Sequence, residues 1–182
     1  MQARPGESLE ILIAAERIEQ RVQALGKAIS RDYQGRSLLL VGILRGSFVF
    51  LADLIRWIDV PVAVDFMAIS SYGASTRSSG VVRILKDLDE EIQDRHVVVV
   101  EYIVDTGLTL NYIHSQLVGR DAASVAICTL LDKPSRRQVD VHLDYLGFQI
   151  PDEFVVGYGL DFDECYRNLR DVCRLRITEE GN

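Results

Sequence analysis

The sequence has little of what would mark a membrane, secreted or disulfide-linked protein. No apolar run approaches the roughly 18 residues that a membrane-spanning helix needs, and the N-terminal stretch MQARPGESLE lacks the apolar segment of a signal peptide. The 182 residues include only three cysteines, without a CxxC pair, which argues against a disulfide framework or a zinc site. We therefore expect a cytoplasmic protein with reduced thiols.

Basic residues are also in short supply, because 20 lysines and arginines stand against 27 acids and give a formal net charge of −7. Nonspecific nucleic-acid binding depends on lysine and arginine to neutralise phosphates, so this balance argues against it. No internal repeat, low-complexity tract or Pro/Gly/Ser-rich linker divides the chain. We expect one domain over residues 1–182, with no nucleic-acid or membrane partner. If this domain binds a phosphate, it must do so through groups gathered at one local site.

What the chain does have is a series of short apolar runs that alternate with segments of helical spacing. Continuous apolar runs are typical of strands buried on both faces, so the series predicts an α/β fold with a mainly parallel central sheet and helices on both faces. A first helix is predicted over residues 9–29, with Ser8 as its N-cap. The strands around 62–85 are expected to form a less regular arm or edge, and a small irregular hood or arm is expected beside the sheet. The other predicted elements are helices over 48–57 and 108–118 and strands over 37–44, 62–70, 81–85, 97–104, 124–131 and 154–158.

Polar residues follow the apolar run of four predicted strands. Ligands of such sheets bind outside the carboxyl ends of the strands, so these polar segments should gather at one rim. The four segments are residues 45–47, 101–109, 132–135 and 159–161.

The segment DTGLT, residues 105–109, has the composition of an anion-binding turn. Gly107 permits a tight turn, the first N–H groups of the following helix point outward, and Thr106 and Thr109 add hydroxyls. The chain has no GK[ST] of a Walker A loop and no GxGxxG after a strand. A phosphate site of another kind is therefore predicted.

With its upstream acid, this segment reads VVVVEYIVDTGLT and resembles the phosphoribosyl-pyrophosphate (PRPP) motif of the type I phosphoribosyltransferases. The flanks LRGSFVFLADL, SSYGASTRSSG, LLDKPSRR and PDEFVVGYGLDFDECYRNL narrow the resemblance to the hypoxanthine-guanine phosphoribosyltransferases. The resemblance covers most of residues 40–170. It implies the joining of a 6-oxopurine to PRPP, which gives the nucleoside monophosphate and pyrophosphate, a requirement for Mg²⁺, and a homodimer or homotetramer.

The resemblance also implies a role for each strand end. Asp105 would accept the proton of purine N7 as the glycosidic bond forms, and Lys133 would donate to the 6-oxo group and so select oxopurines. Glu101 would face the ribose hydroxyls and their Mg²⁺, and Asp161 would bind Mg²⁺. The remaining implied contacts are with the 5′-phosphate (Thr106, Gly107, Leu108, Thr109), the pyrophosphate (Arg45, Gly46, Arg167, with a cis peptide at Leu44-Arg45), the base (Phe154 by stacking, the Val155 backbone) and a mobile lid over residues 70–80 (Ser71, Tyr72).

Tyr102 departs from the family pattern, which has a second acid beside Glu101. Its phenol could replace the acid at a ribose hydroxyl, or its ring could turn into an apolar neighbour. Loss of a charge-assisted hydrogen bond costs about 1.5–3 kcal/mol, or roughly 10- to 150-fold. Tyr102→Asp would then raise activity by that factor. Two alternatives remain: a protein that binds nucleotide without useful turnover, and a transferase for another base.

Overall fold

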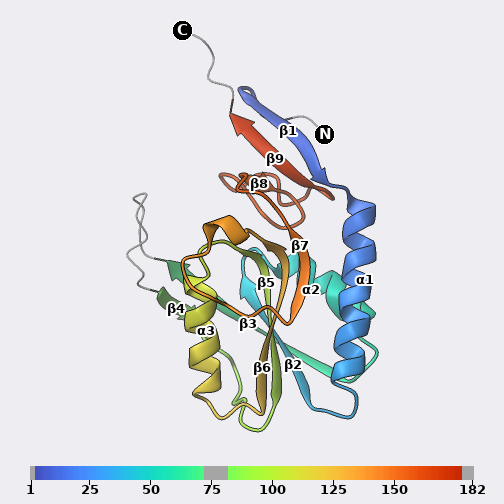
Figure 1. Ribbon diagram of the computed structural model, residues 1–182, viewed down its shortest axis with the longest axis vertical. Helices are drawn as coiled ribbons and strands as arrows, with labels where there is room; N and C mark the ends of the chain where they lie inside the picture. The colour runs from blue at the N-terminus through green and yellow to red at the C-terminus, as the bar shows by residue number, and fades with distance from the viewer. Residues whose placement is uncertain (1–2, 72–81, 178–182) are drawn as a thin grey trace.

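The computed structural model describes residues 3–71 and 82–177, and its main feature is a six-stranded sheet in the order β4-β3-β2-β5-β6-β7. Five neighbouring strands run parallel and only the edge strand β4 is antiparallel. The predicted parallel sheet is confirmed (Figure 1). Its strands are β2 (Leu38–Leu44), β3 (Val62–Ser71), β4 (Val82–Lys86), β5 (His96–Val104), β6 (Ser124–Asp132) and β7 (Tyr145–Gln149).

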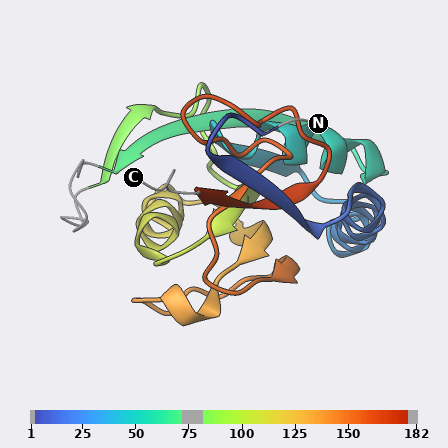
Figure 2. The same ribbon diagram turned by 90° about the horizontal axis from the view of Figure 1, so that it is seen from above.

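Helices cover both faces of the sheet, as predicted. Helices α1 (Ala15–Asp32) and α2 (Phe48–Leu54), with the short helix η1 (Ile55–Trp57), lie on one face, and α3 (Leu108–Val118) lies on the other (Figure 2). Because side chains alternate along a strand, residues such as Val98 and Val100 join the core under α1 and α2, while Val97 and Val99 join the core under α3. This alternation decides which way each residue of β5 points.

A second sheet, in the order β1-β9-β8, stands above the carboxyl ends of the central strands (Figure 1). It consists of β1 (Glu7–Ile13), β9 (Val172–Ile177) and β8 (Val155–Val156), all antiparallel. We call this sheet and the loop 157–171 the hood. Its own small core is formed by Val156, Tyr166, Leu169, Cys173 and Leu175.

The predicted helix over residues 9–29 is wrong at its start, because residues 9–13 belong to strand β1. The segment LEILI fits both a strand and a helix by periodicity, and pairing with β9 decides for the strand. Ser8 therefore does not cap α1. Asp171 of the hood does so instead, because its Oδ1 accepts the Ala15 N–H at 2.8 Å.

Three further differences concern short strands. The predicted strand over 154–158 keeps only two residues, since Gly157 turns the chain at φ 98°. Strands β7 and β9 were not predicted from the sequence. In β7, Gly147 lies so close to β6 that a Cβ there would sit 2.2 Å from the Leu130 carbonyl oxygen.

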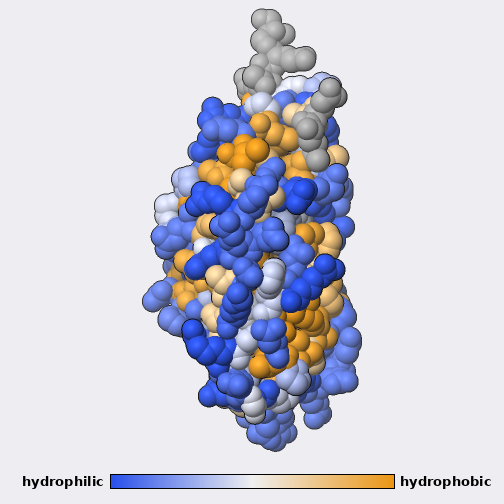
Figure 3. All heavy atoms as spheres, turned by 90° about the vertical axis from the view of Figure 1, so that its right-hand side faces the viewer, coloured by the Kyte–Doolittle hydropathy of each residue, from blue (hydrophilic) through white to orange (hydrophobic). Residues whose placement is uncertain are grey.

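Figure 3 views the molecule from the α1 side, where a hydrophilic band runs down the surface. The helix buries Ile18, Val22, Leu25 and Ile29 and turns its charged residues outward. Within residues 3–71 and 82–177, no helix is both long and apolar enough to cross a membrane.

Candidate active site

The carboxyl ends of β2, β5 and β6 lie side by side, because these strands are parallel neighbours. This places Arg45, Asp105 and Lys133 at one rim. The fourth predicted segment reaches the same place from the hood, since a Cβ on Gly159 would be only 2.7 Å from the Gly46 carbonyl oxygen. The structure thus brings together four segments that are far apart in the sequence.

The turn before α3 has the geometry of an anion-binding site. Gly107 is the N-cap of α3 and adopts φ 83°, a left-handed conformation that favours glycine. The first helical backbone bond runs from the Asn111 N–H to the Gly107 oxygen at 2.9 Å. The N–H groups of Thr109 and Leu110 therefore have no acceptor within the helix and can donate to a phosphate. Thr106 Oγ1 lies 3.4 Å from the Leu108 nitrogen.

Asp105 and Lys133 each lie against a residue that was not among the predicted site residues. The Arg136 Nε donates to Asp105 Oδ1 at 3.0 Å. Lys133 is 8% exposed, and its Nζ lies 3.6 Å from Asp152 Oδ1. Among the described residues Nζ makes no hydrogen bond, so this nearly buried ammonium is suited to an incoming oxygen acceptor. The motif DKPSRR contains Arg136, but its spacing does not say where that side chain turns.

Phe154 directly precedes strand β8 of the hood and is 54% exposed. Its ring meets Phe162 edge to face at 5.6 Å, which leaves ring surface for stacking. The next residue, Val155, is buried in β8 opposite Arg174. This arrangement is compatible with the base contacts that the resemblance implies.

Arg45 and Arg167 approach each other through Glu164. An Arg45 Nη2 lies 3.0 Å from one Glu164 oxygen, and an Arg167 Nη2 lies 3.7 Å from the other. Arg167 also donates to the Gly159 oxygen at 2.9 Å and pairs with Asp161 at 2.5 Å. Two guanidinium groups on one anionic side chain form a site that could take a diphosphate. The expected cis peptide at Leu44-Arg45 is present.

Glu101 and Asp161 are the residues expected to hold Mg²⁺. Glu101 is half-buried, its Oε1 accepts the Tyr102 N–H at 2.7 Å, and burial raises its pKa to about 7. A nearby cation would favour its ionised form. Asp161 Oδ2 accepts the Glu164 N–H at 3.0 Å. Both carry the oxygen ligands that Mg²⁺ prefers. The described residues hold no group of three or more side chains that could bind a metal ion.

Tyr102 does not lie at the rim, which corrects its assignment as a substrate-binding residue. It is 0% exposed and packs in the core under α1 and α2, on the face of β5 opposite Glu101. Its hydroxyl donates to the Gly157 carbonyl oxygen at 2.9 Å. Burial raises the pKa of the phenol. Of the two orientations that the sequence allowed, the ring takes the inward one.

The predicted lid over residues 70–80 lies mostly outside the described residues, and so does Tyr72. Ser71 is the last residue of β3.

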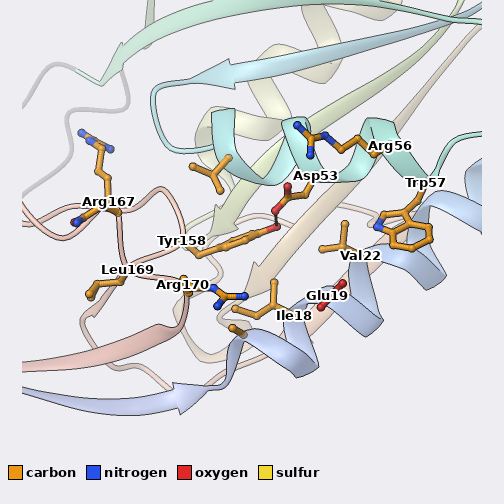
Figure 4. Close-up of a pocket in the computed structure, with 13 residues that line it drawn as sticks. Ile18, Glu19, Val22, Asp53, Arg56, Trp57, Tyr158, Arg167, Leu169 and Arg170 are labelled. Carbon is orange, nitrogen blue, oxygen red and sulfur yellow. Dashed lines mark hydrogen bonds between the residues drawn. The ribbon is translucent and has the colours of Figure 1, made fainter. Parts of the chain in front are cut away.

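A cavity of about 680 Å³ lies behind the rim, between α1, α2 and the loop of the hood (Figure 4). Tyr158 reaches from the hood to α2, where its hydroxyl donates to Asp53 Oδ2 at 2.7 Å. Of the predicted site residues only Arg167 lines this cavity, so the cavity is not the place where the strand ends meet.

Comparison with known proteins gives one consistent result. Residues 8–163 match the phosphoribosyl transferase domain family. A hypoxanthine-guanine phosphoribosyltransferase of Mycobacterium tuberculosis is 50% identical over 171 residues, 91% of this chain and 85% of that protein. A hypoxanthine phosphoribosyltransferase of Salmonella typhimurium is 49% identical over 175 residues, 95% of this chain and 98% of that protein.

A solved structure agrees with this result. The crystal structure of a hypoxanthine phosphoribosyltransferase from Staphylococcus aureus superposes with a TM-score of 0.90 at 46% identity, over 95% of this chain and 94% of that one. The chain therefore belongs to the hypoxanthine-guanine phosphoribosyltransferases.

Proposed function

We propose that the protein is a purine salvage transferase that moves the 5-phosphoribosyl group of PRPP to hypoxanthine or guanine and releases IMP or GMP and pyrophosphate. One observation carries this proposal: a carboxylate, Asp105, and a nearly buried ammonium, Lys133, follow neighbouring strands at one rim. In a 6-oxopurine, the N7 proton and the 6-oxo group are adjacent on one edge. An acceptor and a donor at neighbouring strand ends can meet both.

The rim residues act on PRPP from both ends. The backbone N–H groups of residues 106–109 and the hydroxyls of Thr106 and Thr109 bind the 5′-phosphate. Arg45 and Arg167 replace their contacts with Glu164 by contacts with the pyrophosphate. Purine N9 forms the new bond to C1′ of the ribose while the bond from C1′ to the pyrophosphate oxygen breaks. Asp105 takes the proton that leaves N7, and its charge stabilises the positive ribose of the transition state.

Glu101 and Asp161 are the protein groups proposed to hold Mg²⁺. When bound, the ion neutralises charge on the phosphates of PRPP. Burial raises the pKa of Glu101 to about 7, so a cation bound nearby would favour its ionised form.

The test is an assay of the purified protein with PRPP, Mg²⁺ and hypoxanthine, guanine or xanthine, which follows formation of the nucleoside monophosphate. Asp105→Ala serves as the inactive control. Binding of PRPP and base without turnover would favour the alternative of a nucleotide-binding protein. Turnover with a different base and none with oxopurines would show that the protein is a phosphoribosyltransferase for another class of base.

We also propose that the protein is a homodimer or homotetramer and that it works in the cytoplasm. Support for assembly comes from exposed apolar side chains on α2, β3 and β4, namely Phe48, Val64 and Leu85. Three free cysteines suit a reducing compartment. Light scattering coupled to size-exclusion chromatography would test the assembly.

A further inference from the structure

Four side chains of alternating charge form a continuous chain along the rim. Asp105 pairs with Arg136 at 3.0 Å, Arg136 lies 3.7 Å from Asp152, and Asp152 lies 3.6 Å from Lys133. The two ends of the chain are the proposed proton acceptor and the proposed donor to the 6-oxo group. No ion pair joins these two ends directly.

We infer that Arg136 and Asp152 are positioning residues, which hold Asp105 and Lys133 apart and aim both at one edge of the purine. This inference rests on the proposed function of the rim. It concerns two residues that neither make the new bond nor belong to the phosphate-binding turn.

The ion pairs among these four side chains contribute little to the stability of the fold. Arg136, Asp105 and Asp152 are 48%, 43% and 52% exposed, and ion pairs of such exposure stabilise proteins only weakly. The adjacent arginine has the structural role, because Arg137 pairs with the buried Asp132 at 2.8 Å. Two neighbouring arginines thus serve different purposes, and that of Arg136 lies at the rim.

The backbone fixes the distance between the members of the chain. Arg136 ends the short helix η2 (Pro134–Arg136), and its N–H donates to the Lys133 oxygen at 3.0 Å. The Lys133 N–H donates to the Val104 oxygen at 2.9 Å, directly before Asp105. Because these bonds join the two loops, the Arg136 side chain can hold Asp105 Oδ1 and leave Oδ2 free for the N7 proton.

Without Arg136, the carboxylate of Asp105 would lose the partner of its Oδ1 and could turn away from N7 of the base, whereas Lys133 would keep its contact with Asp152. Without the charge of Asp152, Lys133 would lose the one carboxylate that lies within ion-pair distance among the described residues. Entry of the base removes water from the rim, and the lower local dielectric strengthens the ion pairs of Asp105 with Arg136 and of Lys133 with Asp152 while the base is bound.

The experiment compares Arg136→Gln, Arg136→Lys and Asp152→Asn with the matched control Arg120→Gln, which breaks an Arg-Asp pair of similar exposure with Asp87 away from the rim. We expect Arg136→Gln to lower kcat/KM for hypoxanthine by about 10- to 100-fold, the range of a charge-assisted hydrogen bond, while the KM for PRPP changes by less than about twofold. Arg136→Lys should restore most of this loss. Asp152→Asn should raise mainly the KM for the base.

A second measurement separates positioning from a general structural effect. Inhibition by 7-deazahypoxanthine, which lacks the N7 proton, should respond to Arg136→Gln by less than about twofold, because Asp105 has no proton to accept from it. The inference is overturned if Arg136→Gln has no larger effect than Arg120→Gln, or if it impairs the use of hypoxanthine and of PRPP equally. It is also overturned if hypoxanthine and 7-deazahypoxanthine bind more weakly by the same factor. A wild-type protein that binds both substrates without turnover would refute the proposed function instead. The same variants would then be compared by calorimetry of hypoxanthine binding to the PRPP complex.

Discussion

Tyr102→Phe tests most directly whether the Tyr102 side chain serves the core of the protein and not the ribose of PRPP. It removes only the hydroxyl, which is fully buried and donates to the Gly157 oxygen at 2.9 Å. The same oxygen also accepts the Leu160 N–H at 3.0 Å, so it keeps one partner. The loss is therefore that of an ordinary hydrogen bond, about 0.5–1.5 kcal/mol, and not that of an orphaned buried carbonyl.

We expect the free energy of unfolding to fall by about 1 kcal/mol and Tm by about 2–4 °C, the shift typical of a protein of this size. The KM for PRPP should change by less than about twofold, because the hydroxyl faces the core under α1 and α2. Urea unfolding, followed by fluorescence, and initial rates at varied PRPP provide the two measurements. A severalfold rise in the KM for PRPP at unchanged stability would refute this reasoning and return the hydroxyl to the ribose.

The structure also changes the expectation for Tyr102→Asp. The new carboxylate would enter an apolar core beside a carbonyl oxygen, which offers it no donor, and the lost ring would leave a cavity. Large-to-small changes of buried aromatics cost about 3–5 kcal/mol, and an unpaired buried charge adds to this. We now expect destabilisation rather than the gain in activity that the family pattern suggested.

Three further substitutions or conditions test other parts of the molecule. Lys133→Gln should lower kcat/KM for oxopurines by about 10- to 150-fold with little change in the KM for PRPP, and an equal loss for both substrates would mean that the lysine supports the phosphate site. Glu164→Gln should lower the KM for PRPP by up to about fivefold, the equivalent of one exposed ion pair, because Arg45 and Arg167 no longer pair with a carboxylate; a raised KM would contradict this. Burial, with the Asp53 hydrogen bond for Tyr158, raises the pKa of Tyr102 and Tyr158 above that of the unfolded chain. Their contribution to stability is complete below about pH 10 and is lost as the pH rises above it. The free energy of unfolding measured in urea should therefore fall above about pH 10, and it should fall less in Tyr102→Phe.

The parts of the fold that the sequence predicted are those with a strong local pattern. Strands β2, β5 and β6 are continuous apolar runs, and α3 begins directly after Gly107, a residue type that favours tight turns. Strand β1 has no such signal. Its partner β9 lies at the other end of the chain, so only tertiary pairing distinguishes LEILI from the first turns of α1.

The site divides in the same way. The strand ends and the DTGLT turn could be selected because a parallel sheet must bring its carboxyl ends together. Arg136 and Asp152 could not, because their role depends on distances between the loops at 105, 136 and 152. The sequence shows two adjacent arginines in DKPSRR. Only the structure shows that one turns to the buried Asp132 and the other to Asp105.

Tyr102 shows how a motif can mislead about a single side chain. A match to the PRPP motif treats Glu101 and its neighbour as a pair with one task. The pleat of a strand sends consecutive side chains to opposite faces, so on regular β5 the two cannot both face the ribose directly. The phenol at position 102 instead bridges β5 and the Gly157 turn, and it shares the core under α1 and α2 with Val155. A large residue is tolerated there because that position belongs to the core, and the rim keeps Glu101, Asp105 and Lys133 for its chemistry.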